Sequence, residues 1–266
     1  MSTMQVRLEI MQGIARLTLQ RPDKLNSLTT LMHAQLREAL TEVERRTDVR
    51  VLLLTGSGRG FCAGQDLADR AVAPDAAADA APDLAASVER DYAPLVRRLR
   101  DLPVPVVCAV NGVAAGAGVS LALACDLVLA RRSARFILSF CRLGLLPDTG
   151  GTYFLPRLIG TARALGVALL GEPIDAQQAE DWGLIWRCID DALFEQEVDD
   201  LLTRLARAPT LGLTHTRQAI HAAAGRSLPA QLEHEAAAMR VLGRSQDYRE
   251  GVAAFLERRE PHFHGH

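Results

Sequence analysis

Two short stretches of the chain, 49–55 and 105–110, are almost entirely apolar, and the first ends at Gly56. Each has the length of a strand. Neither shows the apolar–polar alternation of a sheet with one face in water. Segments with helical spacing of apolar residues accompany them, at 29–46 and 88–99. Strands buried on both faces and separated by helices predict an α/β protein with a parallel sheet.

The two ends of the chain differ in pattern. Residues 5–10 and 14–19 alternate around Gln12 and Gly13, which predicts a hairpin. Beyond Gly151 only 184–189 has strand character, and helical patterns occupy 160–170, 175–182, 192–207, 210–223, 228–243 and 246–259. We therefore divide the chain into an α/β core, 1–190, and a C-terminal helical region, 191–266, expected to pack on a neighbour within the subunit or across an interface.

Composition limits the class of protein. The 266 residues carry a net charge of −2 and no basic stripe, which disfavours nucleic acid as a partner. No run of about 18 apolar residues suggests a membrane span, and the N-terminus lacks the pattern of a signal peptide. The five cysteines are scattered and never spaced as C-x-x-C, which disfavours zinc and disulfides. We expect a cytoplasmic enzyme with no metal site.

Residues 68–86 are nearly all Ala, Asp and Pro and offer little to bury. Such a segment is typical of a mobile loop. Two interpretations remain equally open, a lid or entrance over a pocket and a tolerated surface insertion.

Three glycine-rich segments, 58–66, 111–118 and 143–151, suggest places where the backbone passes close to a ligand. Gln65 is expected to lie at a helix start, and Ala117 to open a buried helix over 116–124. Backbone N–H groups at such starts could converge on one oxygen and stabilise a developing negative charge. The alternative is that the glycines only allow helices and strands to pack closely.

Asp148 stands in the third segment, followed by Thr149, Gly150 and Gly151. Local sequence favours a helix N-cap. A role in proton transfer needs a partly apolar pocket that raises its pKa. The apolar residues that could supply one are Phe136, Ile137, Leu138, Phe140, Leu143, Leu145 and Leu146.

Histidines are absent between His33 and His215, and His33 is expected on the surface of a helix. The region of the glycine-rich turns therefore offers no Ser-His or Cys-His pair. Hydrolysis by a catalytic triad is disfavoured, although Ser120 and Ser139 lie nearby.

Taken together, several segments resemble the crotonase family, also called the enoyl-CoA hydratase/isomerase superfamily. They are RPDKLNSL at 21–28, GFCAGQDL at 60–67, GVAAGAG at 112–118, GGT at 150–152, LPR at 155–157 and AEDWGL at 179–184. The resemblance implies a crotonase-type spiral of ββα units with a C-terminal helical trimerisation region, assembled as a homotrimer or a dimer of trimers. It also implies an acyl-CoA thioester as substrate, with CoA as part of that substrate and no separate cofactor.

The same resemblance assigns roles to residues. The Gln65 and Ala117 amides would hold the thioester oxygen, and Asp148 would be the acid and base. Residues that match positions binding CoA and the acyl group are Lys24, Leu25, Ala63, Asp66, Leu67, Gly116 and Phe140. Arg258 or Arg259 would reach the CoA phosphates.

Departures from the family pattern narrow the range of reactions that we expect of this chain. Members that hydrate enoyl-CoA use two glutamates, and the matching positions here are Ser120 and Phe140; at Asp148 those hydratases carry glycine. The arrangement is similar to members that isomerise the ring-1,2-epoxide of phenylacetyl-CoA in phenylacetate degradation. We therefore expect an acyl-CoA isomerase, which could also shift a 3-enoyl-CoA double bond to the 2-position.

Two alternatives stay open. One is a dehalogenase of the 4-chlorobenzoyl-CoA type, in which Asp148 is the nucleophile. Such enzymes carry tryptophan where this chain has Phe140, and also a pocket histidine. The other is a family member that binds CoA esters without catalysis.

Overall fold

The computed structural model describes residues 4–69 and 83–266. Most of the loop expected over 68–86 lies outside these residues. The larger sheet has six strands in the order β1-β2-β3-β5-β7-β10. The hairpin of β1 (Val6–Met11) and β2 (Ile14–Leu19) is antiparallel, as predicted. The strands β3 (Val51–Gly56), β5 (Val106–Val110), β7 (Leu127–Arg131) and β10 (Arg187–Ile189) extend it in parallel.

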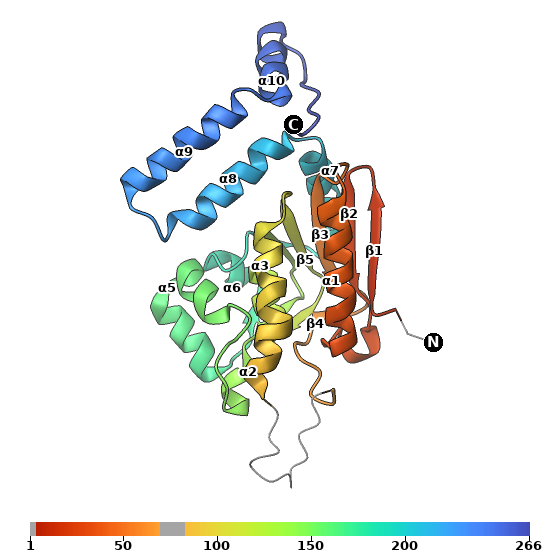
Figure 1. Cartoon of the computed structure of the whole chain (residues 1–266). Helices are drawn as coiled ribbons and strands as arrows, with labels where there is room; N and C mark the ends of the chain where they lie inside the picture. Colours follow the sequence, from red (N-terminus) through yellow and green to blue (C-terminus); the bar gives the residue numbers. More distant parts are fainter. Residues whose placement is uncertain (1–3, 70–82) are drawn as a thin grey trace.

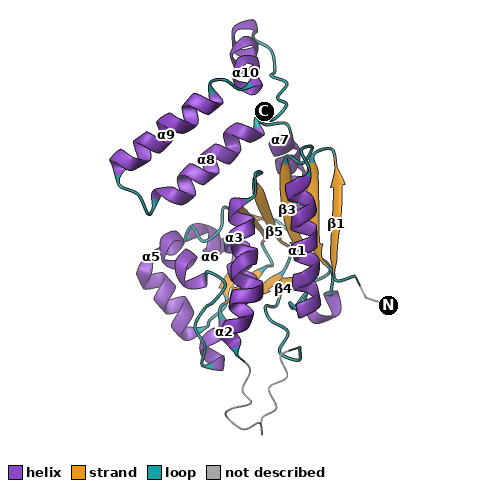
Figure 2. Cartoon of the chain, in the orientation of Figure 1, coloured by secondary structure: helices purple, strands orange, loops and turns teal. Residues whose placement is uncertain are grey.

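Both faces of this sheet are covered, which explains the continuous apolar pattern of its central strands. Leu52 and Leu54 belong to the main core, which includes residues of helices α1 (Thr30–Arg45) and α3 (Ala93–Asp101). Val51 and Leu53 point the other way, into a second cluster with helix α7 (Phe194–Ala206). Figure 2 shows the strands between these helical layers.

A second sheet, of four very short strands, was not visible in the sequence pattern. It consists of β4 (Gly60–Cys62), β6 (Val113–Ala115), β8 (Arg135–Ile137) and β9 (Ile174–Asp175). Strands of two or three residues are too short for a periodicity to appear. Each of β4, β6 and β8 follows a strand of the larger sheet and precedes a helix. This succession is the ββα repeat that the family resemblance implies, and the predicted fold class is confirmed.

The helices of the core frame the smaller sheet. They include α2 (Leu84–Ser87), which runs through a π-helical turn, Val88–Tyr92, into α3. Helix α4 (Ala117–Leu123) is buried at every residue, and α6 (Ala176–Asp181) follows β9. Helix α5 (Gly151–Leu170) begins nine residues before the predicted 160–170. The early part was missed because Pro156 and Gly160 interrupt the pattern; Gly160 has non-helical dihedrals and kinks the helix.

By length and composition alone, Gly151–Leu170 could also cross a membrane, a test that core helices of soluble proteins pass as well. Its side chains Phe154, Leu155 and Ile159 belong to the main core.

The C-terminal region has two parts. The first part, α7, packs on the larger sheet. Helices α8 (Thr210–Ala223), α9 (Leu228–Leu242) and α10 (Gln246–Glu257) stand away from the core (Figure 1). Arg217 ties α8 back by donating to Asp126 and to the Leu99 carbonyl. Helices α9 and α10 leave large apolar side chains exposed, including Leu228, Leu232, Met239, Val241, Phe255 and Leu256.

Candidate functional site

A cavity of about 150 Å³ lies where the three glycine-rich segments meet. Asp148, Gln65 and Ala117 all line it, although they come from separate parts of the chain. Of the seven other predicted site residues, four line the cavity, Ala63, Leu67, Gly116 and Phe140, whereas Lys24, Leu25 and Asp66 do not. The fold therefore brings the predicted catalytic residues together.

Two glycines, Gly64 and Gly116, lie where the first two segments meet. A Cβ atom at Gly64 would lie 2.8 Å from the Ala115 carbonyl oxygen and 3.2 Å from the Ala117 nitrogen. Both Gly64 and Gly116 have positive φ, at 84° and 52°, which side chains other than glycine rarely adopt. Glycine is needed at Gly64 because the two backbones touch there, whereas at Gly116 the backbone conformation favours it.

The orientation of the two amides follows from the planar trans peptide, in which C=O and N–H point in opposite directions. The Gly64 carbonyl accepts from the Leu28 N–H at 2.7 Å, so the Gln65 N–H points away from Leu28. The Gly116 carbonyl accepts from the Val119 N–H at 3.0 Å within the first turn of α4. Ala117 is the first residue of that helix, and its N–H has no partner within the helix.

The expectation that Gln65 opens a helix is wrong. It forms an isolated bridge with Leu28, and a turn follows at 67–69. The pairing with Leu28, rather than a helix start, fixes its peptide.

Asp148 is half-buried, and its Oδ1 accepts from Thr149 Oγ1 at 2.9 Å. The local preference for an N-cap is not realised, because the N-cap of α5 is Gly150. Asp148 contributes its backbone carbonyl, which accepts from the Gly151 N–H at 2.8 Å. Its carboxylate is thus placed at the cavity by the turn before α5.

The apolar wall of the cavity is smaller than predicted. Phe140, Leu143 and Leu145 line it. Phe136 and Leu138 are buried in the main core instead. Ile137 and Leu146 do not line the cavity either, and Leu146 is exposed.

Three of the predicted CoA-binding residues, Lys24, Leu25 and Asp66, lie outside the cavity lining. Lys24 is exposed, and Leu25 adopts a left-handed conformation and accepts from the Ala63 N–H at 2.9 Å. Asp66 turns away from the cavity and forms an ion pair with Arg21 at 2.8 Å. The hydrogen bond from Arg21 holds the pKa of Asp66 below its usual value. Its carboxylate therefore has a structural partner.

The positions of the hydratase glutamates hold no acid. Ser120 is fully buried against Gly151, and Phe140 forms part of the cavity wall. Burial raises the pKa of the nearby Cys62 thiol to about 12, so this group stays protonated. Among residues 4–69 and 83–266, no cluster of side chains suits a metal ion. Asp148 is the carboxylate that the cavity presents.

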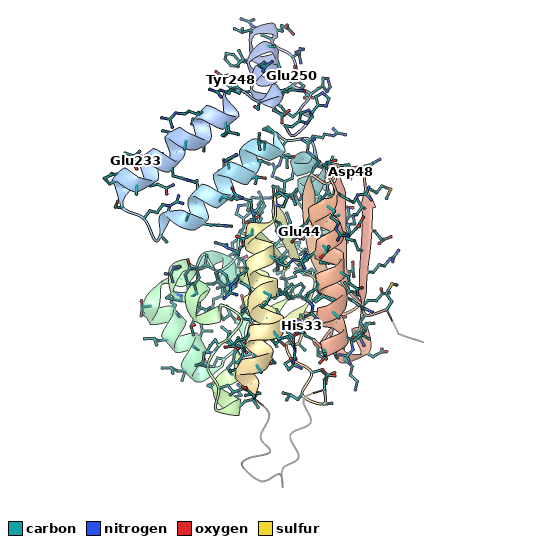
Figure 3. The ribbon with its side chains drawn as sticks, viewed as in Figure 1. His33, Glu44, Asp48, Glu233, Tyr248 and Glu250 are labelled. Carbon is teal, nitrogen blue, oxygen red and sulfur yellow. The ribbon has the colours of Figure 1, made fainter. Side chains whose placement is uncertain are left out.

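Sequence reasoning missed Tyr92 and misplaced His33. Tyr92 lines the cavity and its hydroxyl donates to Gln65 Oε1 at 2.5 Å. His33 is buried rather than on the surface, and its ring packs edge-on against Tyr92, with centroids 4.5 Å apart. Figure 3 shows His33 near the start of α1, toward α3. The unbroken apolar register of α1, which includes Met32 and Leu36, could have placed His33 at its buried edge.

Comparison with known proteins gives a consistent result. Residues 9–266 match the family model described as enoyl-CoA hydratase/isomerase. The chain is 56% identical over 254 residues to the 1,2-epoxyphenylacetyl-CoA isomerase of Escherichia coli (strain K12), covering 96% of both chains. It is 36% identical to the 2,3-dehydroadipyl-CoA hydratase of the same strain, again over 96% of both.

Solved structures agree with these relatives. The enoyl-CoA hydratase of Bacillus anthracis superposes with a TM-score of 0.91 at 30% identity, covering 99% of this chain and 100% of that one.

Proposed function

Because the chain belongs to the enoyl-CoA hydratase/isomerase family, we propose that it is an acyl-CoA isomerase working through an enolate. The observation that carries this proposal is the meeting of Asp148 with the Gln65 and Ala117 amides at one cavity. A thioester oxygen between the two N–H groups would be polarised, and its C2 protons would become more acidic. The two amides act as an oxyanion hole.

In the proposed reaction, Asp148 takes a proton from C2 of the acyl group. The electrons of that C–H bond form the enolate, whose negative oxygen accepts from Gln65 and Ala117. The proton then returns to a different carbon of the conjugated system. One carboxylate suffices as base and then acid, because an isomerisation consumes no net proton.

We propose the ring-1,2-epoxide of phenylacetyl-CoA as substrate, with an oxepin-CoA as product, in phenylacetate degradation. The support is the 56% identity to the Escherichia coli isomerase of that name. A shift of a 3-enoyl-CoA double bond to the 2-position requires the same proton transfer and is proposed as a second activity.

The arrangement disfavours hydration and dehalogenation. Syn addition of water needs a base for that water, and Ser120 and Phe140 stand where hydratases carry glutamates. In a dehalogenase a tryptophan would replace Phe140. Moreover, His33 contacts Tyr92 and is absent from the residues that line the cavity.

For the CoA part, Lys24 and Leu25 would contact the nucleotide end, and Ala63, Leu67 and Gly116 the pantetheine and thioester. Lys24 is exposed and cationic, as a phosphate contact requires. Arg259 is already paired with Glu250 and Glu257, which leaves Arg258 as the better C-terminal candidate. No further cofactor enters the reaction.

We also propose that the subunits assemble as a trimer or a dimer of trimers in the cytoplasm. The support is the set of exposed apolar side chains on α9 and α10, which a second subunit would cover. The interface that these helices would form falls within the predicted region 191–266.

The test of this function is turnover of the epoxide ester and of a 3-enoyl-CoA, followed by mass spectrometry and absorbance. We expect both to be isomerised, and Asp148→Asn to bind the esters with little change in Kd while losing turnover. Asp200→Asn, on the exposed face of α7, is the matched control. Release of halide from 4-chlorobenzoyl-CoA, or undiminished turnover by Asp148→Asn, would overturn the assignment.

A further inference from the structure

Tyr92 is held more firmly than its place in a cavity wall requires. It closes the π-helical turn Val88–Tyr92, an arrangement that is rare and often occurs at functional sites. The side chain is only 1% exposed, so its hydroxyl must find a partner inside the protein. That partner is Gln65 Oε1, at 2.5 Å.

Two neighbours set the position of the Tyr92 ring. His33 on α1 packs against it edge-on, at an interplanar angle of 78°. The preceding residue, Asp91, is buried and accepts from Arg37 at 3.0 Å and from Arg90 at 2.8 Å. The bond to Arg37 fastens the π-helical turn to α1, which also carries His33. The hydroxyl is therefore aimed by contacts outside the cavity.

Hydrogen bonds therefore hold both the backbone and the side chain of Gln65. Its backbone is fixed through Leu28, which accepts from the Asp66 N–H at 2.9 Å and donates to the Gly64 carbonyl. Its side chain accepts from Tyr92 and donates through Nε2 to the Asp66 carbonyl at 3.1 Å. With both ends of the residue fastened, the Gln65 peptide loses freedom to rotate, and the direction of its N–H is set before a ligand arrives.

Building on the isomerase function proposed above, we propose that Tyr92 is a positioning residue that orients the Gln65 N–H toward the thioester oxygen through its bond to the Gln65 side chain. The phenol hydrogen is committed to Gln65, so Tyr92 itself transfers no proton. The oriented Gln65 N–H stabilises mainly the enolate, because the negative charge on the oxygen is greatest there. Binding of the ground-state ester depends on Tyr92 only weakly.

The first experiment compares wild type with Tyr92→Phe, which keeps the ring and its contact with His33. We expect kcat for 3-enoyl-CoA isomerisation to fall about 10- to 100-fold, with Kd for phenylacetyl-CoA nearly unchanged. Tyr153→Phe, at an exposed position of α5 outside the cavity lining, is the control and should match wild type. An unchanged kcat in Tyr92→Phe would overturn the inference.

A double-mutant cycle separates positioning from a general loss of structure. Gln65→Met keeps the backbone N–H but removes the acceptor of the Tyr92 bond. If Tyr92 acts only through that side chain, adding Tyr92→Phe to Gln65→Met should cause no further loss of activity. Multiplicative losses would show that the two residues act independently and would contradict the inference.

A spectroscopic measurement distinguishes failure of this inference from failure of the isomerase function. The probe is phenylacetyl-CoA labelled with ¹³C at the thioester carbonyl, whose stretch drops in frequency when the oxygen is polarised. We expect a clear drop on binding to wild type and a smaller one in Tyr92→Phe. Equal drops would refute the role of Tyr92 alone. No drop in wild type would refute the oxyanion hole itself.

Discussion

Thr149 Oγ1 donates a hydrogen bond to Asp148 Oδ1 at 2.9 Å, from a backbone that has a positive φ of 57°. A β-branched residue rarely adopts this conformation, so the turn holds Thr149 at some conformational cost. Thr149 is also buried, with 3% of its surface exposed. The bond fixes the position of one carboxylate oxygen of Asp148. The turn before α5 sets the direction in which the carboxylate points.

Loss of this bond should slow catalysis. We expect Thr149→Ala to reduce kcat about tenfold or more, because the carboxylate can rotate away from C2, while Kd for the CoA ester stays similar. Thr149→Ser retains the hydroxyl and should recover most of the activity. Steady-state kinetics on 3-enoyl-CoA checks both variants, and equal rates for the alanine variant and wild type would contradict the positioning of Asp148 by Thr149.

The contact between the first two glycine-rich segments predicts a steric effect. Gly64→Ala should lower the free energy of unfolding by about 2 kcal/mol or more, since the new Cβ meets the Ala115 carbonyl in a strained conformation. Activity should fall as well, because the two amides are displaced. Gly166→Ala, in open space on α5, is the control and should be neutral or stabilising by up to about 1 kcal/mol. Denaturant unfolding measures both.

Asp126 predicts a pH dependence of stability. It accepts from Arg217 Nε and from the Val106 N–H, and its Oδ1 lies 3.2 Å from His221 Nε2. Burial alone would raise the pKa of Asp126, but bonds from His221 and Arg217 outweigh it and hold the pKa below its ordinary value. A carboxyl with a depressed pKa in the folded state stabilises above its unfolded pKa, and this contribution is lost as pH falls.

We therefore expect Asp126→Asn to lower the free energy of unfolding by about 3 kcal/mol at neutral pH, because Arg217 loses its buried partner. The difference from wild type should shrink below about pH 4, near the pKa of an unfolded Asp. Urea unfolding at fixed protein concentration across this range is the measurement. Asp199→Asn, whose pair with Arg16 is exposed, should change stability by less than about 1 kcal/mol. A pH-independent difference would contradict the role of the ionised carboxyl.

The exposed apolar side chains of α9 predict how the subunits behave in solution. Light scattering of wild type should give a mass of three or six times 28.9 kDa. The double substitution Leu232→Glu with Met239→Glu should shift this mass toward the monomer, since charged groups cannot be buried at an interface without cost. Met11→Glu, an equally exposed apolar position at the end of β1, should leave it unchanged. A monomeric wild type would rule out the proposed assembly.

The sequence predicted the parts of the fold whose signal is local. Strand β5 and the first four residues of β3 are buried on both faces and therefore apolar, and α1 and α8 have clear helical spacing. The second sheet could not be found in this way, because β4, β6 and β8 have three residues each. Only the family resemblance implied them.

Within the site, the glycine-rich turns raised a possible role for Asp148, Gln65 and Ala117, the family resemblance assigned that role, and the fold brings all three to one cavity. Tyr92 was missed because it reaches the cavity only through a π-helical turn, which shifts its side chain relative to an α-helix. His33 was predicted to be exposed because nothing in the local sequence shows that a polar residue at the edge of an apolar helix face is buried. Both depend on packing between α1 and the segment before α3.

Proton–deuterium exchange at C2 of phenylacetyl-CoA in D₂O tests the central claim most directly, because it reports enolate formation without any later step. Exchange should be fast with wild type and should fall at least a hundredfold with Asp148→Asn, the size of effect expected when a general base is removed. Both proteins should bind the ester with similar Kd. Absence of exchange in wild type with the ester bound, or equal exchange in the two proteins, would contradict proton transfer by Asp148.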